Sequence, residues 1–108
     1  MRRLLLAATL ALAAGPSLAD GFVIGPGRWS CADAVRIWGA EMTPPKGQLA
    51  GWILGYWTAE SFRREKAFVD RVEAAGGLRI AEATIQECRK APEAQLYRVV
   101  QSMIRNTR

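Results

Sequence analysis

The two cysteines are the side chains with the clearest chemistry in this chain of 108 residues. Cys31 and Cys88 are far apart, and neither a histidine nor a third cysteine accompanies them. Structural metal sites are usually built from four Cys or His ligands, so this pair predicts no metal site. Redox-active pairs are more often spaced as C-x-x-C. We therefore predict a structural disulfide, which would close a loop of about 58 residues and stabilise the fold by roughly 4 kcal/mol.

Side chains suited to acid, base or nucleophilic catalysis are few. The chain has no histidine, which excludes a triad with an imidazole base, and oxidised cysteines offer no thiolate. Paired carboxylates occur in two places, Glu60 with Glu65 and Glu82 with Glu87. A spacing of i,i+5 places neither pair on one face of a helix. We predict no catalytic residues, no cofactor and no enzyme activity.

Positive charges are interleaved with negative ones along the chain. There are 15 Lys+Arg and 10 Asp+Glu, and the two signs alternate over residues 60–73. Glu60 with Arg64 and Lys66 with Asp70 stand at i,i+4, the spacing of ion pairs on a solvated helix. Nucleic-acid binding needs positive charge gathered on one face. The sequence therefore predicts no nucleic-acid partner.

Residues 1–19 have the layout of a secretory signal peptide. Two arginines precede an apolar run over residues 4–14, and a small-x-small cleavage site, Ser17-Leu18-Ala19, follows. A run of about eleven residues rises only about 16 Å as a helix, roughly half the hydrocarbon thickness, which disfavours a membrane anchor. We predict cleavage before Asp20, a mature chain of residues 20–108 without a membrane span, and export to the periplasm. Cysteines pair in such an oxidising compartment.

The mature chain has helical periodicity and no sustained strand alternation. Residues 20–29 are rich in glycine and predict an extended N-terminal arm. Ser30 is a good N-cap for a first helix over residues 31–39. The segment Pro44-Pro45-Lys46-Gly47 predicts a turn that is not helical. A second helix is predicted over residues 48–62.

Three further helices complete the prediction. One covers residues 67–75 and ends at Gly76-Gly77. The next runs from about Leu78 or Ile80 to Lys90 and places Cys88 on its apolar face. Pro92 is predicted to open the last helix, because the first helical position needs no N–H donor. The sequence thus predicts a single all-α domain, a bundle of four or five short helices closed by one disulfide.

The second predicted helix is apolar on nearly every side. Gly51, Gly55 and Ala59 form a stripe of small residues along it. Such a helix is either the central helix of the bundle or has one face committed to a partner. Leu54 and Trp57 lie off the main apolar stripe, which makes them the best candidates for a dimer or partner contact. The predicted recognition residues are Trp52, Ile53, Leu54, Tyr56 and Trp57.

Three features of the chain support a family resemblance: Cys31 soon after the signal segment, the Trp52-Ile53-Leu54-Gly55-Tyr56 segment, and Cys88 followed by Pro92. In these features the chain resembles the HdeA/HdeB-like family of small periplasmic proteins. The resemblance implies a single-disulfide helical protein that is dimeric near neutral pH and becomes a monomeric chaperone for unfolding clients in acid. Small periplasmic immunity proteins of type VI secretion have a similar layout and are the alternative. Either way, we expect protein partners or clients.

Acid would strongly raise the charge of the mature chain. Removing Arg2 and Arg3 leaves 13 basic against 10 acidic side chains, and protonating every carboxylate would take this charge from +3 to +13. The resulting self-repulsion opposes a compact state. Because the chain has no histidine, we expect the transition roughly between pH 2 and 4, where Asp and Glu ordinarily titrate. The aromatic residues of the second helix would then be free to cover clients.

Overall fold

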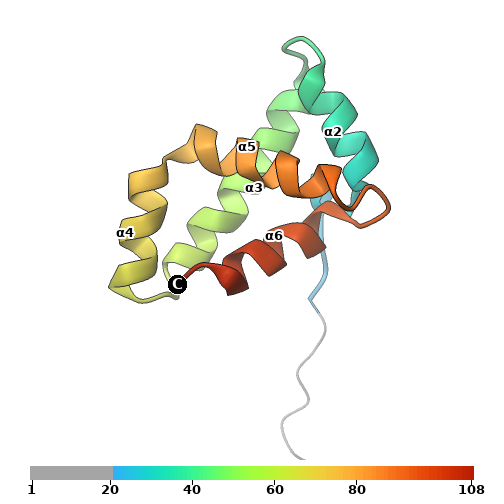
Figure 1. The fold of residues 1–108 in the computed structure, drawn as a ribbon. Helices are drawn as coiled ribbons and strands as arrows, with labels where there is room; N and C mark the ends of the chain where they lie inside the picture. The colour runs from blue at the N-terminus through green and yellow to red at the C-terminus, as the bar shows by residue number, and fades with distance from the viewer. Residues whose placement is uncertain (1–20) are drawn as a thin grey trace, which may run out of the picture.

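Five α-helices and one short 3₁₀ helix make up residues 21–108, the part of the chain that the computed structural model describes (Figure 1). In chain order they are η1 (Gly25–Arg28), α2 (Cys31–Gly39), α3 (Pro44–Ser61), α4 (Lys66–Ala75), α5 (Gly77–Arg89) and α6 (Leu96–Asn106). The predicted all-α domain is confirmed. The predicted signal peptide, residues 1–19, lies outside the described residues.

The longest helix, α3, is the centre of the bundle. It runs diagonally behind α5 in Figure 1, and it contacts η1 and all four other helices. Leu49, Ile53 and Trp57 follow one another at i,i+4 along it and are buried. A helix that is apolar on most sides is stable in water only when neighbours cover those sides. Of the two interpretations of this segment, the structure favours the central core helix.

The start of α3 differs from the prediction. Pro44 and Pro45 occupy its first turn, so the segment Pro44-Pro45-Lys46-Gly47 is helical, and the predicted turn is wrong. The reason is that the first turn of a helix has no internal acceptors for its N–H groups, and the fixed φ of proline suits the helix there. The backbone N–H of Gly47 already donates to the carbonyl of Thr43 (N···O 3.1 Å).

The predicted disulfide is present and joins α2 to α5. Cys31, at the start of α2, is bonded to Cys88, in the last turn of α5, across a sequence separation of 57 residues. Both cysteines are fully buried. The side chain of Ser30 accepts a hydrogen bond from the N–H of Asp33, which confirms the predicted cap and fixes where α2 begins.

Backbone hydrogen bonds lie beside the disulfide. Residues 29–32 pair with residues 92–96 in an antiparallel arrangement that we call the clasp. The N–H of Cys31 donates to the carbonyl of Ala94 (2.8 Å), and the N–H of Leu96 donates to the carbonyl of Trp29 (2.9 Å). The carbonyl of Pro92 accepts from Ala32 (3.0 Å), so Pro92 lies in the clasp and α6 begins only at Leu96. The prediction that Pro92 opens the last helix is wrong.

The segment predicted as an extended arm is partly helical. Residues 25–28 form η1, which packs on α3 and α6, and only residues 21–24 lack regular structure. The indole Nε1 of Trp52 donates to the carbonyl of Ile24 (2.8 Å). A Cβ atom on Gly27 would lie 2.1 Å from the Trp52 ring, so only glycine permits this approach. Trp52 of α3 therefore helps to hold the segment in place.

The stripe of small residues on α3 does not serve helix packing within the chain. Gly51, Gly55 and Ala59 are exposed, and a Cβ atom added at either glycine would meet nothing within 4 Å. The glycine that a neighbouring side chain approaches closely is instead Gly27, against the Trp52 ring.

Removing the disulfide should greatly lower the stability of the domain. We expect the double variant Cys31→Ala, Cys88→Ala to lose about 4 kcal/mol, and its melting temperature to fall by roughly 15–30 °C in a circular-dichroism melt. The wild type treated with a reductant is the control and should melt near the variant. A fall of less than about 5 °C would contradict a major role for the disulfide.

The contact between Gly27 and Trp52 yields a second expectation. Gly27→Ala should destabilise the domain by about 1–3 kcal/mol, because the methyl group would overlap the indole ring. Gly21→Ala is the matched control, since a Cβ atom there meets nothing within 4 Å, and it should change stability by less than about 0.5 kcal/mol. Urea unfolding followed by tryptophan fluorescence measures both. Equal stability of the two variants would show that the ring moves aside without cost.

Candidate functional site

Two of the predicted recognition residues lie in the core. Ile53 is fully buried and Trp57 is 5% exposed. Trp57 stacks on Phe68 of α4, with ring centroids 6.0 Å apart. The prediction that Trp57 lies on an open face for a partner is therefore wrong for the folded chain. The sequence shows the apolar circumference of α3, but it does not show that α4 folds back to cover this side.

Two other predicted recognition residues, Trp52 and Leu54, make contacts within the chain. Trp52 is half-buried and bound to the backbone of Ile24. Leu54 is also half-buried, and its side chain lies against Gly77 at the start of α5. Tyr56 packs beside Trp52, with ring centroids 5.3 Å apart. Of the five predicted residues, Tyr56 is the one that borders an open groove.

This groove runs along the seam between α3 and α6. Three adjoining hollows form it. The middle hollow shares Tyr56 and Gln101 with the hollow at one end, and it shares Arg64 and Arg105 with the hollow at the other end. Phe22 and Val23 border one end, and Arg108 borders the other. We call it the basic groove. Its polar and aromatic lining residues are Phe22, Tyr56, Glu60, Arg63, Arg64, Glu65, Phe68, Tyr97, Arg98, Gln101, Arg105, Thr107 and Arg108.

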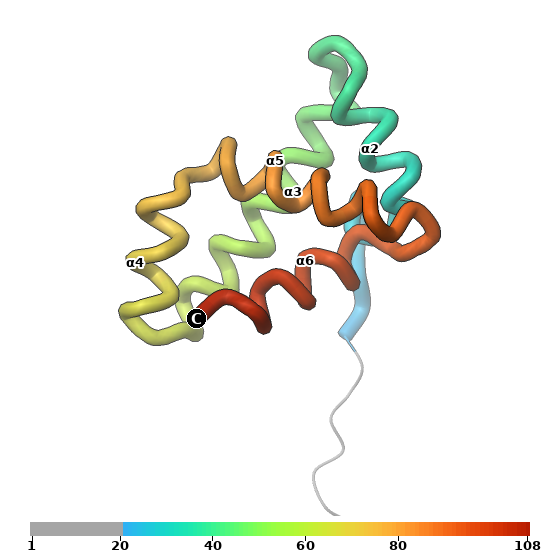
Figure 2. The backbone as a smooth tube through the Cα atoms, viewed as in Figure 1, coloured from blue at the N-terminus to red at the C-terminus, as the bar shows by residue number. Residues whose placement is uncertain are grey.

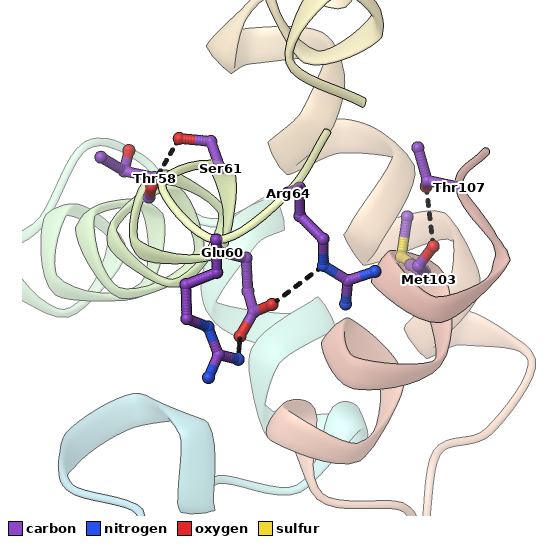
Figure 3. A network of polar contacts seen from close by, with 7 residues as sticks. Thr58, Glu60, Ser61, Arg64, Met103 and Thr107 are labelled. Carbon is purple, nitrogen blue, oxygen red and sulfur yellow. Dashed lines mark hydrogen bonds and ion pairs between the residues drawn. The ribbon is translucent and has the colours of Figure 1, made fainter. Parts of the chain in front are cut away.

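Glu60 organises the α3 side of the groove. Its carboxylate accepts hydrogen bonds from both Arg63 and Arg64, the latter at 3.3 Å from Nε to Oε2 (Figure 3). The Glu60 side chain is only 12% exposed. The predicted ion pair of Glu60 with Arg64 is thus confirmed, and so is that of Lys66 with Asp70.

Arg64 is held from a second direction. Its guanidinium lies over the ring of Phe68, 5.3 Å from the centroid, in a cation–π contact. Phe68 stacks in turn on Trp57, so the position of Arg64 is fixed by the packed core. Figure 3 shows its side chain leaving the connection between α3 and α4 and reaching toward the last turn of α6. This arginine is therefore preorganised for an anion, with less side-chain freedom left to lose on binding.

The α6 side of the groove is a helix face. Tyr97, Gln101 and Arg105 recur every four residues along α6, with Arg98 beside Tyr97, while the adjoining face carries the buried residues Leu96, Val100 and Ile104. Arg108 follows the end of the helix. The hydroxyl of Thr107 donates to the carbonyl of Met103 (2.8 Å) and closes the last turn (Figure 3). The amphipathic pattern that buries one side of α6 therefore leaves Arg98 and Arg105 exposed at the groove.

Positive charge is concentrated in the basic groove. Five arginines and two glutamates line it, which leaves +3, whereas all other charged residues in 21–108 together leave +1. Within residues 21–108, no acidic side chain lies within ion-pair distance of Arg98, Arg105 or Arg108. Sequence reasoning missed this cluster because Arg63 and Arg64, which follow α3, are far along the chain from the arginines at α6. Arg98 and Arg105 on the polar side of α6, with Arg108 just after it, were the available signal.

The groove can hold an extended anionic segment. Arginine binds carboxylates through two parallel hydrogen bonds, and its fork remains charged at any physiological pH. Tyr56 and Tyr97 offer aromatic surface between the arginines and the apolar end at Phe22. From Tyr97 to Arg105 the helix rises about 12 Å, which matches about four residues of extended peptide.

A second, apolar hollow lies among α3, α4, α5 and α6 and shares no lining residue with the basic groove. Trp57 forms part of its lining, and the indole Nε1 of Trp57 is buried with no hydrogen-bond acceptor. An unpaired buried donor costs about 1–3 kcal/mol. This side chain therefore retains a hydrogen-bonding capacity that the folded chain does not use.

Within residues 21–108, His, Cys, Asp and Glu nowhere gather in a group of three that could bind a metal ion. None of the helices described is both long and apolar enough to cross a membrane.

Comparison of the chain with protein-family models, with curated proteins and with solved structures finds no match.

Proposed function

We propose that this protein binds another protein, and that the basic groove receives an acidic, extended segment of that partner. The observation that carries the proposal is the convergence of Arg63, Arg64, Arg98, Arg105 and Arg108 on one groove. Three of the five have no acidic partner within residues 21–108, so their donors are free for a ligand. A protein partner at neutral pH is also what the layout shared with type VI immunity proteins implies.

A protein segment suits the groove better than a nucleic acid. Glu60 and Glu65 lie among the arginines, and Glu60 is fixed between two of them. These carboxylates would repel a continuous phosphate backbone, whereas a peptide can place its acidic side chains selectively. The small contact length points to a weak or transient interface, with micromolar affinity.

The charge of the groove, as opposed to the net charge of the protein, should set affinity for an acidic peptide. We expect the fluorescein-labelled peptide Asp-Glu-Leu-Asp-Glu to bind in an anisotropy titration at low salt. The double variant Arg98→Gln, Arg105→Gln should bind about three- to tenfold more weakly, since each exposed charge pair contributes up to about 1 kcal/mol.

The matched control is Arg71→Gln, Arg89→Gln, which removes the same charge from exposed residues that do not line the groove. It should retain the wild-type affinity after correction for salt. Equal weakening by both double variants would contradict a specific site. Tighter binding of a labelled oligothymidylate than of the peptide would favour a nucleic acid instead.

We propose acid-activated client holding as a second candidate function, because the folded chain hides the residues that it requires. Ile53 and Trp57 are in the core and can reach a client only if the domain opens. Protonation of the carboxylates removes the partners of arginines such as Arg64 and raises the mature charge from +3 toward +13. The disulfide would keep the opened chain tethered.

The stability of the folded domain should accordingly fall as the pH is lowered. We expect a cooperative change in tryptophan fluorescence roughly between pH 2 and 4, and slower aggregation of an acid-sensitive client when the protein is present. The Arg98→Gln, Arg105→Gln variant serves as the control, since client holding would not depend on the native groove. A flat fluorescence titration with unchanged client aggregation would remove this second candidate and leave the groove proposal standing.

A further inference from the structure

The apolar hollow among α3, α4, α5 and α6 has the size and lining of a ligand site. Its volume is about 350 Å³, within the range of about 300–1,000 Å³ of small-molecule sites. Trp57, Ile80 and Met103 supply larger apolar side chains, and Ala75 and Ala83 are too small to fill the space between them. Figure 2 shows how α4 turns away from α5 at their short connection, with α3 behind.

The single charged residue at this hollow is Arg79 of α5. It is exposed, and no acidic side chain in residues 21–108 lies within ion-pair distance of it. An apolar hollow bordered by one free guanidinium is complementary to a molecule with an apolar body and one anionic end. Trp57, which lines the hollow, also has a buried Nε1 with no acceptor within residues 21–108.

We infer that this hollow binds an alkyl carboxylate, with the chain against Trp57 and Ile80 and the carboxylate on Arg79. The apolar lining accounts for the chain, and the unpaired arginine accounts for the charge. A ligand oxygen that reached the indole Nε1 would also supply its missing acceptor. The site shares no residue with the basic groove, so the inference does not depend on the function proposed above.

Calorimetric titration of the protein with decanoate, below its micelle concentration, tests the site. Ala83→Leu should weaken binding by about tenfold or more, because the larger side chain occupies the hollow in a closely packed structure. Arg79→Gln should weaken it about two- to fivefold, the effect of losing one exposed charge pair. Arg89→Gln, an exposed arginine of the same helix outside the hollow, is the matched control and should bind as the wild type does.

A second measurement reports on Trp57, which lines the hollow. The indole N–H resonance of Trp57, assigned by its loss in Trp57→Phe, should shift on addition of decanoate. Absence of decanoate binding to the wild type, or equal binding by the wild type and Ala83→Leu, would overturn the inference. Arg105→Gln distinguishes the two sites: if it weakens decanoate binding as much as Arg79→Gln does, the ligand occupies the basic groove and the inference is wrong.

Discussion

The clasp and the disulfide beside it are the constraint on which the rest of the fold depends. Cys31 is bonded to Cys88 through its sulfur and to Ala94 through its backbone N–H, so one residue ties α2 to both α5 and the start of α6. A small domain buries too little apolar surface to be secure without such a link. With these three helices joined at one end, their apolar faces are held beside α3.

The same packing places the candidate site. Because α3 contacts η1 and every other helix, Trp57 is buried and Trp52 is half-buried, and Tyr56 and Glu60 border the basic groove. A continuous series of contacts runs outward from the core: Trp57 stacks on Phe68, and Phe68 lies under Arg64. The basic groove is thus an exterior surface whose key arginine is positioned by interior packing.

Local signals in the sequence predicted most of the helices, whereas contacts between distant segments were not predictable. Ser30 identified the start of α2, and the helical spacing of Cys88 with its apolar neighbours identified α5. The role of a proline depends on what surrounds it: Pro44 begins a helix, while Pro92 is held in the clasp by a hydrogen bond to a segment about sixty residues earlier. The burial of Trp57 against α4 was likewise not predictable, because periodicity shows that a helix has an apolar face but not which element covers that face.

Native-state hydrogen exchange tests the central role of the clasp most directly. If the clasp holds the fold together, the amides of Cys31, Ala32 and Leu96 open only when the whole domain unfolds, and they exchange as slowly as the amide of Ile53 in the middle of α3. Fast exchange of these three amides, with Ile53 still protected, would show that the clasp opens while the core stays intact, and would contradict the account.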